Sequence, residues 1–265
     1  MIMKKQIFYL FPYCLLLISC QSSTKKTATP EPVWADEFNY QGLPDSTKWT
    51  CETGGHGWGN NELQFYTAKR PENARVENGN LVIEARKEDW EGKKYTSTRL
   101  ISRSKGDWKY GRIEIRARIP KGLGTWPAIW MLASTDPLNW PDDGEIDIME
   151  HVGFEQGIVH ASVHTKKYNH VIGTQKTATI PVPDCSDNFH VYALDWSKDS
   201  IRISIDSNIY FTFANEHSGS QAWPFDQPFH LLLNIAIGGD WGGKKGVDDR
   251  IFPVRMEIDY VRVYR

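Results

Sequence analysis

The chain has 265 residues, of which 40% are hydrophobic and 24% are charged, and its formal net charge is −2. These values exclude a disordered or collagen-like chain, and the near-zero charge argues against a nucleic-acid-binding protein, which needs a basic surface. The 11 Trp residues stand out beside 11 Tyr and 11 Phe, because Leu and Val can fill a core equally well. This much indole requires an explanation.

The first residues are expected to form an export signal rather than part of the fold. Lys4 and Lys5 precede an apolar stretch over 7–18, which is shorter than the roughly 20 residues of a transmembrane helix. The stretch ends at Ser19-Cys20, which resembles the end of a bacterial lipoprotein signal. We therefore expect residues 1–19 to be a lipoprotein-type signal peptide. A lipid on Cys20 would anchor the exported protein in the cell envelope, on the periplasmic or the outer side. The alternative is an ordinary signal peptide with an incidental Cys.

Residues 20–32 are rich in Ser, Thr, Lys and Pro without an apolar pattern, which predicts a flexible tether. The domain that follows is expected to span residues 33–265, since no second linker or internal repeat interrupts the sequence. It contains two cysteines, Cys51 and Cys185. An oxidising compartment permits a disulfide between them, and the sequence leaves this pairing open.

The domain is predicted to be all-β. Apolar and polar residues alternate over 81–86, 112–119 and 201–205, and the alternation resumes over 209–213 after the turn Asp206-Ser207-Asn208, which indicates a hairpin. An apolar run over 229–237 predicts a strand buried on both faces, and 256–264 predicts a last strand. Many short strands favour a sandwich of two antiparallel sheets, and a curved sheet would leave a concave face for a ligand.

The most informative segment is 142–150, Asp-Asp-Gly-Glu-Ile-Asp-Ile-Met-Glu. Glu145 and Asp147 alternate with apolar residues and therefore share one face of a strand. Glu150 would point to the other face unless a β-bulge adds one residue and returns it. We expect this bulge at Ile148-Met149, because both residues are apolar and can point into a core.

Three acids on one face suit the cleavage of glycosidic bonds. Like charges at this spacing resist simultaneous ionisation, so at least one pKa should rise. A protonated acid beside an ionised carboxylate is what that reaction needs. The alternatives are a solvated acidic edge or a calcium site. Both alternatives are less favoured because tryptophans lie just before the acids in the sequence, at Trp126, Trp130 and Trp140. Their indole rings can stack on the apolar faces of sugars.

The acid segment Glu145-Ile-Asp147-Ile-Met-Glu150 resembles the signature of glycoside hydrolase family 16 in its bulged, laminarinase-type form. The resemblance covers residues 33–265 through further segments in the expected order. These are 36–38 Asp-Glu-Phe, 59–64 Gly-Asn-Asn-Glu-Leu-Gln, 110–112 Tyr-Gly-Arg, 126–128 Trp-Pro-Ala, 234–239 Asn-Ile-Ala-Ile-Gly-Gly and 258–264 Ile-Asp-Tyr-Val-Arg-Val-Tyr.

The resemblance implies a jelly-roll β-sandwich with an open cleft across its concave face, and a retaining endo-glycosidase. Glu145 would be the nucleophile, Glu150 the general acid and then the general base, and Asp147 would hydrogen-bond the nucleophile. The resemblance and the indole rings together predict substrate contacts from Asn61, Arg99, Trp126, Trp130, Trp140, His164, Asn234 and Trp241. From the residues alone, Asn61 could instead be a turn residue and His164 a structural histidine.

Many members of that family carry a structural calcium away from the catalytic acids. The matching positions here are Glu37, Gly79 and Asp259, which would bind through backbone carbonyls and one carboxylate. No cofactor is expected for catalysis, and the protein is expected to be a monomer.

The expected substrate is a laminarin-type β-1,3-glucan, a neutral polysaccharide that suits the slight negative charge. Two alternatives stay open within the family: the same acids could cut mixed-linkage β-1,3-1,4-glucan or a galactan such as agarose. A different class of protein, a non-catalytic glycan-binding lipoprotein on the same fold, would be expected to lack one or more of the three acids.

Overall fold

The computed structural model of the chain describes residues 1–4, 6 and 31–265. The expected signal peptide and tether lie almost wholly outside these residues, and Cys20 lies outside them too. Within the described part of the chain, no helix is long and apolar enough to cross a membrane.

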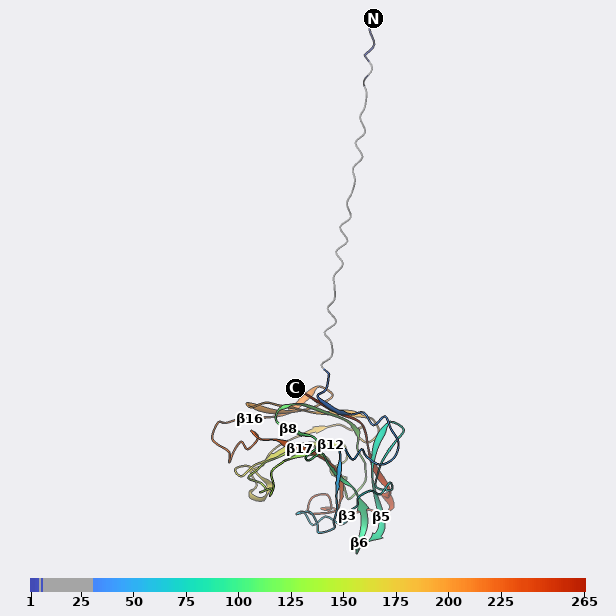
Figure 1. The fold of residues 1–265 in the computed structure, drawn as a ribbon, viewed down its shortest axis with the longest axis vertical. Coiled ribbons are helices and arrows are strands. Elements are labelled where there is room, and N and C mark those ends of the chain that lie inside the picture. The colour runs from blue at the N-terminus through green and yellow to red at the C-terminus, as the bar shows by residue number, and fades with distance from the viewer. Residues whose placement is uncertain (5, 7–30) are drawn as a thin grey trace. The chain divides into compact units, whose positions relative to one another are not determined.

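Residues 31–265 form two β-sheets that pack on each other, as the alternating patterns predicted (Figure 1). The larger sheet has the order β16-β15-β14-β9-β18-β5-β6-β3, with β1 beside β18 and β4 beside β5. Its strands are β1 (Trp34–Asp36), β3 (Gln64–Tyr66), β4 (Ala74–Glu77), β5 (Asn80–Trp90), β6 (Lys93–Ser97), β9 (Gly111–Arg118), β14 (His190–Trp196), β15 (Ser200–Ile205), β16 (Asn208–Ala214) and β18 (Val254–Tyr264).

The smaller sheet has the order β13-β12-β11-β10-β17-β7-β2, with β8 beside β17. Its strands are β2 (Thr50–Glu52), β7 (Arg99–Ile101), β8 (Asp107–Trp108), β10 (Thr125–Ala133), β11 (Glu145–Glu150), β12 (Ile158–His164), β13 (Lys176–Pro181) and β17 (Phe229–Ile237). Two short 3-10 helices, η1 (His170–Ile172) and η2 (Asp249–Ile251), lie in the connections. The pairings around β11 and β10 are antiparallel, whereas β3 and β6 are parallel.

The core lies between the two sheets and follows the predicted alternation. On β9, Ile113, Ile115 and Ala117 are fully buried, while the intervening arginines and Glu114 are partly exposed. All nine residues of β17 are buried, which confirms the strand expected over 229–237. Trp49 and Trp196 are buried in this core, so part of the tryptophan excess serves packing.

The hairpin predicted around residue 206 is formed by β15 and β16. Asp206 and Ser207 connect the strands, and both have positive φ values, 48° and 72°. Two consecutive residues in this conformation give a turn whose twist matches that of the flanking strands. The pairing left open by the sequence is also resolved, since Cys51 and Cys185 are both free thiols.

Candidate active site

The β-bulge expected in β11 is present and brings the third acid to the face of the first two. On β12, Glu145 pairs with His164 and Glu150 with His160, and the register shifts between Asp147 and Glu150. On β10, Ile129 pairs with Met149 but Trp130 pairs with Asp147, so Ile148 is the extra residue. Ile146, Ile148 and Met149 are fully buried. Their burial explains the bulge: the apolar side chains enter the core and all three acids turn away from it.

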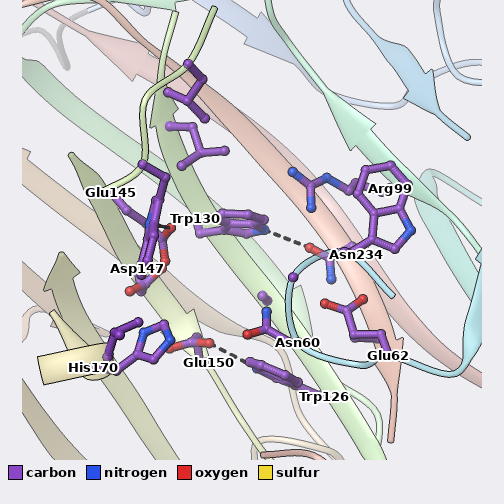
Figure 2. Close-up of a pocket in the computed structure, with 18 of the residues that line it drawn as sticks. Asn60, Glu62, Arg99, Trp126, Trp130, Glu145, Asp147, Glu150, His170 and Asn234 are labelled. Carbon is purple, nitrogen blue, oxygen red and sulfur yellow. Dashed lines mark hydrogen bonds between the residues drawn. The ribbon is translucent and has the colours of Figure 1, made fainter. Parts of the chain in front are cut away.

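The acids open into a cavity of about 390 Å³ on the outer face of the smaller sheet. β10 shows how the sheet divides its side chains: Ile129 and Met131 are buried in the core, whereas Trp130 and Leu132 line the cavity. The other strands contribute in the same alternating way. The lining residues are His56, Trp58, Gly59, Asn60, Glu62, Arg99, Trp126, Ala128, Trp130, Leu132, Leu138, Trp140, Glu145, Asp147, Glu150, His170, Val171, Asn234 and Ala236 (Figure 2).

Each of the two glutamates of β11 accepts a hydrogen bond from an indole. Trp140 Nε1 donates to Glu145 Oε2 over 2.7 Å. Trp126 Nε1 donates to Glu150 Oε1 over 3.0 Å (Figure 2). Because an indole N–H can only donate, both bonds favour the ionised carboxylate. The two tryptophans therefore orient the acids as well as offering their rings to a ligand.

Burial raises the pKa of all three carboxyls, and the charge of a neighbouring acid adds to the effect. The pKa rises to about 8 for Glu145 and to about 7 for Glu150, and it rises well above the usual value for Asp147. Groups that interact this strongly titrate as a unit. At neutral pH the cluster therefore holds protons, which a site that must donate one to a leaving group requires.

Asp147 is the acid that keeps its proton most firmly, because its side chain is only 2% exposed. A hydrogen bond links the Asp147 and Glu145 carboxyls, and the repulsion between the two groups disappears when one of them is protonated. His164 lies on the other side, with Nε2 at 3.3 Å from Asp147 Oδ2 and 3.9 Å from Glu145 Oε1. His164 and the Trp140 N–H each lower the pKa of Glu145, which favours the carboxylate form that a nucleophile needs.

The opposite side of the cavity is built around an arginine between two indole rings. The Arg99 guanidinium carbon lies 4.7 Å from the ring centre of Trp58 and 4.8 Å from that of Trp130. Its Nε donates to Glu52 Oε2 over 2.6 Å. Trp130 Nε1 also donates to Asn234 Oδ1 over 2.7 Å (Figure 2). Stacked and ion-paired groups of this kind give a rigid surface with flat apolar faces, which suits a sugar ring.

Three predicted contact residues lie outside the lining of the cavity. Asn61 is exposed, and its amide donates to the Asp240 carboxylate over 2.9 and 3.0 Å; its neighbours Asn60 and Glu62 line the cavity instead. Trp241 packs edge-on against Trp126 with ring centres 5.4 Å apart. His164 also lies behind the lining, against the acids.

Several lining residues were not singled out from the sequence. Glu62 belongs to the family-like segment 59–64, yet no alternation or spacing in that segment assigns it a role. His170 and Val171 come from the connection between β12 and β13, and His56 and Leu138 also lie outside the strands. A loop side chain carries no periodic signal, so its position depends on tertiary packing alone.

One carboxylate oxygen of Glu145, one of Asp147 and a nitrogen of His164 lie within 4.8 Å of one another, which is close enough to surround a metal ion. An ion held there would occupy Glu145. A chelator therefore distinguishes a metal centre from an acid pair that acts directly on a sugar.

The expected calcium ligands lie near one point of β18, where its pairing partner changes from β5 to β1. Asp36 pairs with Val261, and Leu81 pairs with Ile258, so Glu37 and Gly79 both fall close to Asp259. The carboxylates are already engaged: Arg116 donates to Asp259, and Arg262 forms two hydrogen bonds with Glu37. To bind a calcium ion at this point, the Asp259 carboxylate would have to leave Arg116.

The chain is similar to several known proteins in sequence and in fold. A family model for glycosyl hydrolases family 16 matches residues 61–262. A beta-glucanase of Rhodothermus marinus is 55% identical over 262 residues, covering 94% of this chain and 92% of that protein. The X-ray structure of the laminarinase from Rhodothermus marinus has a TM-score of 0.88 at 56% identity, covering 89% of this chain and 98% of that chain.

A second solved structure carries a ligand. It is a non-specific endo-β-1,3(4)-glucanase of family 16, co-crystallised with 1,3-β-D-cellotriosyl-glucose. It has a TM-score of 0.86 at 50% identity and covers 90% of this chain and 95% of that chain. The family match spans most of the domain, and both solved structures share the fold of this chain over nearly their whole length. This chain therefore belongs to glycosyl hydrolases family 16.

Proposed function

We propose that this protein hydrolyses internal β-1,3 bonds of laminarin-type β-glucan with retention of anomeric configuration. The observation that carries the proposal is the bulge at Ile148, which places Glu145, Asp147 and Glu150 in one cavity floored by indole rings. The similarity to a laminarinase and to β-glucanases supports β-glucan as the substrate class.

The first step breaks the glycosidic bond. The Glu145 carboxylate attacks the anomeric carbon, and the bond between that carbon and the leaving oxygen breaks with its electron pair. Glu150 donates its proton to that oxygen, so the leaving sugar departs as a neutral alcohol. Glu145 is then esterified to the sugar, and Glu150 is ionised.

The second step restores the enzyme. The Glu150 carboxylate takes a proton from water, and the water oxygen attacks the anomeric carbon. The bond to Glu145 breaks, its carboxylate is regenerated, and Glu150 again carries the proton. Asp147 supports both steps, because its hydrogen bond orients Glu145 and stabilises the negative charge when Glu145 is free.

A substrate panel tests this function. Laminarin, lichenan and agarose are incubated with the protein, and the released oligosaccharides are profiled over time. Internal cleavage of laminarin into short oligosaccharides is the expected result, and it should persist in EDTA because no metal takes part in either step. Release from agarose without release from laminarin would overturn the choice of substrate.

Mixed-linkage β-1,3-1,4-glucan is a second candidate substrate. The observation that favours it is the similarity, at 50% identity, to an endo-β-1,3(4)-glucanase that is described as non-specific. Hydrolysis of lichenan in the same panel tests it directly. A non-catalytic glycan-binding role is disfavoured because all three acids are present and oriented into the cavity.

We further propose that the protein is exported, acts as a monomer and is held to the cell envelope by a lipid on Cys20. The support for export and for the anchor is the sequence of residues 1–20. Mass spectrometry of the mature N-terminus tests the anchor: a lipidated Cys20 is expected, and an unmodified N-terminus at another residue would refute it. Size-exclusion chromatography with light scattering should give the monomer mass.

We also propose that a calcium ion binds at Glu37, Gly79 and Asp259 and stabilises the fold. The support is the convergence of these three positions on β18, where its pairing changes from β5 to β1. Calcium should raise the Tm of the EDTA-treated protein without changing its catalytic pH profile. An unchanged Tm would refute the proposal.

A further inference from the structure

A buried carboxyl group faces the catalytic acids from across the cavity. Glu62 is only 6% exposed, yet it lines the cavity on the side of Arg99 and Asn234 (Figure 2). Neither step of the proposed reaction uses it. A buried carboxyl is costly unless its oxygens accept hydrogen bonds, so its partners indicate what it does.

A continuous line of hydrogen bonds connects Glu62 to the indole floor of the cleft. Tyr66 Oη donates to Glu62 Oε2 over 3.2 Å. Asn234 Nδ2 donates to Tyr66 Oη over 3.0 Å, and Trp130 Nε1 donates to Asn234 Oδ1 over 2.7 Å. These four residues come from β3, β10, β17 and the loop before β3, so the line ties together segments far apart in sequence.

The direction of this line is fixed at its start. An indole N–H can only donate, so the atom of Asn234 that faces Trp130 must be the amide oxygen. The amide nitrogen then faces Tyr66, whose hydroxyl oxygen accepts from it. The hydroxyl proton of Tyr66 must point elsewhere, and Glu62 Oε2 accepts it.

The other end is fixed as well. Gln64 Oε1 accepts from the backbone N–H of Ile237 over 2.7 Å, which leaves Gln64 Nε2 to donate to Glu62 Oε2 over 2.6 Å. One oxygen of Glu62 therefore accepts two hydrogen bonds. Burial raises the pKa of Glu62, and the hydrogen bond from Gln64 and the charge of Arg99 oppose this rise. Since both Gln64 and Tyr66 donate to Oε2, this end of the line is an acceptor.

We propose that Glu62 is a positioning residue that orients the Asn234 amide and the Trp130 ring toward the substrate, acting through Tyr66. The proposal rests on the proposed function, since it assigns the residue to the same cleft. One hydrogen of Asn234 Nδ2 is used by Tyr66, and the line directs the second toward a sugar hydroxyl. Without the acceptor at Glu62, the Tyr66 hydroxyl and the Asn234 amide can reverse, and Trp130 loses its partner.

Tyr66 separates this role from a direct contact between Glu62 and the sugar. Tyr66 is fully buried and cannot touch a ligand in the cavity. Tyr66→Phe keeps the ring, which packs edge-on against Trp58 at 5.2 Å, and removes only the hydroxyl. Tyr192→Phe is the matched control, because Tyr192 is equally buried and its hydroxyl has no hydrogen-bond partner in the described part of the chain.

The test compares kcat and KM on laminarin for Glu62→Leu, Glu62→Gln, Tyr66→Phe and Tyr192→Phe. We expect Glu62→Leu and Tyr66→Phe to raise KM about three- to tenfold, the effect of one lost hydrogen bond, with little change in kcat. The double variant should be no worse than the more impaired single variant, because both break one line. Glu62→Gln should keep a KM close to that of the wild type, since its amide oxygen can accept both bonds.

Two results would overturn the proposal. A wild-type KM in Tyr66→Phe would show that the line does not reach the substrate, even if Glu62→Leu does not fold. A Glu62→Gln variant as impaired as Glu62→Leu would show that Glu62 acts by its charge. If the wild type releases nothing from laminarin, the substrate assignment fails instead. The same variants are then compared on whichever glycan of the panel the wild type cleaves.

Discussion

Trp140 and Trp126 each donate an indole N–H to one of the two glutamates of the site. The bonds are similar in length, but they affect different parts of the reaction. Trp140 favours the ionised form of Glu145, which must attack. Trp126 favours the ionised form of Glu150. This form must arise only when Glu150 has given its proton to the leaving group. The acidic limb and the basic limb of the pH profile can therefore be shifted separately.

Replacing Trp140 by Phe should move the acidic limb of the pH profile of kcat/KM upward by about one pH unit. The variant keeps an aromatic ring but removes the donor to Glu145, so the pKa of Glu145 rises and the nucleophile is lost at a higher pH. Trp126→Phe is the matched control, because it should move the basic limb upward instead. Identical shifts in both variants would contradict the separate roles of the two glutamates.

Replacing either glutamate should remove nearly all hydrolysis. Glu145→Ser loses the nucleophile, and Glu150→Gln loses a proton donor that contributes about 100- to 10,000-fold to the rate. Binding of laminarin-derived oligosaccharides, measured by calorimetry, should remain in both variants because the aromatic floor is unchanged. Full activity in either variant would refute its assigned role.

At the scale of the element, the register of β11 determines whether the site exists. The acids and the bulge could be predicted from the sequence, because a period-2 pattern that breaks at Ile148-Met149 leaves only one way to keep three acids out of the core. The lining residues from loops could not be predicted. His170 and Val171, for example, reach the cavity through the fold of the β12–β13 connection, which no alternation encodes.

Deleting Ile148 alone should leave the three acids on one face. The shortened segment reads Glu-Ile-Asp-Met-Glu, which alternates strictly, so a regular strand still presents Glu150 on the side of Asp147 and activity is retained. Deleting Ile148 and Met149 together should abolish activity, because Glu150 then falls on the core face, where an acid has no partner and lowers stability. Activity on laminarin and the circular dichroism spectrum are measured for both variants. Wild-type kcat in the double deletion would show that Glu150 does not depend on the register of β11.

At the scale of the whole molecule, the buried acids reduce the stability of the fold at higher pH. Glu150 has a usual pKa of 4.5 and a pKa of about 7 in the folded protein. Between these values the folded protein holds a proton that the unfolded chain has released, so the free energy of unfolding falls as the pH rises through this window. The site is therefore kept at a cost in stability, as is common where groups are arranged for function.

The Glu150→Gln variant should be more stable than the wild type at pH 8, by about 1 to 3 kcal/mol, and equally stable near pH 4.5. Urea unfolding at the two pH values measures the difference. The same stability difference at both pH values would contradict the effect of burial on Glu150.

The fold as a whole could be predicted from alternation and turn residues, and the structure confirms two sheets around one core. The division of the tryptophans could be predicted only in part. Trp49 and Trp196 fill the core, whereas Trp58, Trp126, Trp130 and Trp140 line the cavity. Whether a tryptophan faces the core or the cavity depends on strand register and on the paths of the loops. Between β10 and β11, for example, the register shifts at the bulge.

The most direct test of the account is the anomeric configuration of the first products from laminarin, followed by proton NMR immediately after mixing. The double displacement through Glu145 predicts that β-anomers of laminari-oligosaccharides appear first and mutarotate later. Initial release of α-anomers would contradict the nucleophilic role of Glu145, and an absence of any release would contradict the assigned substrate.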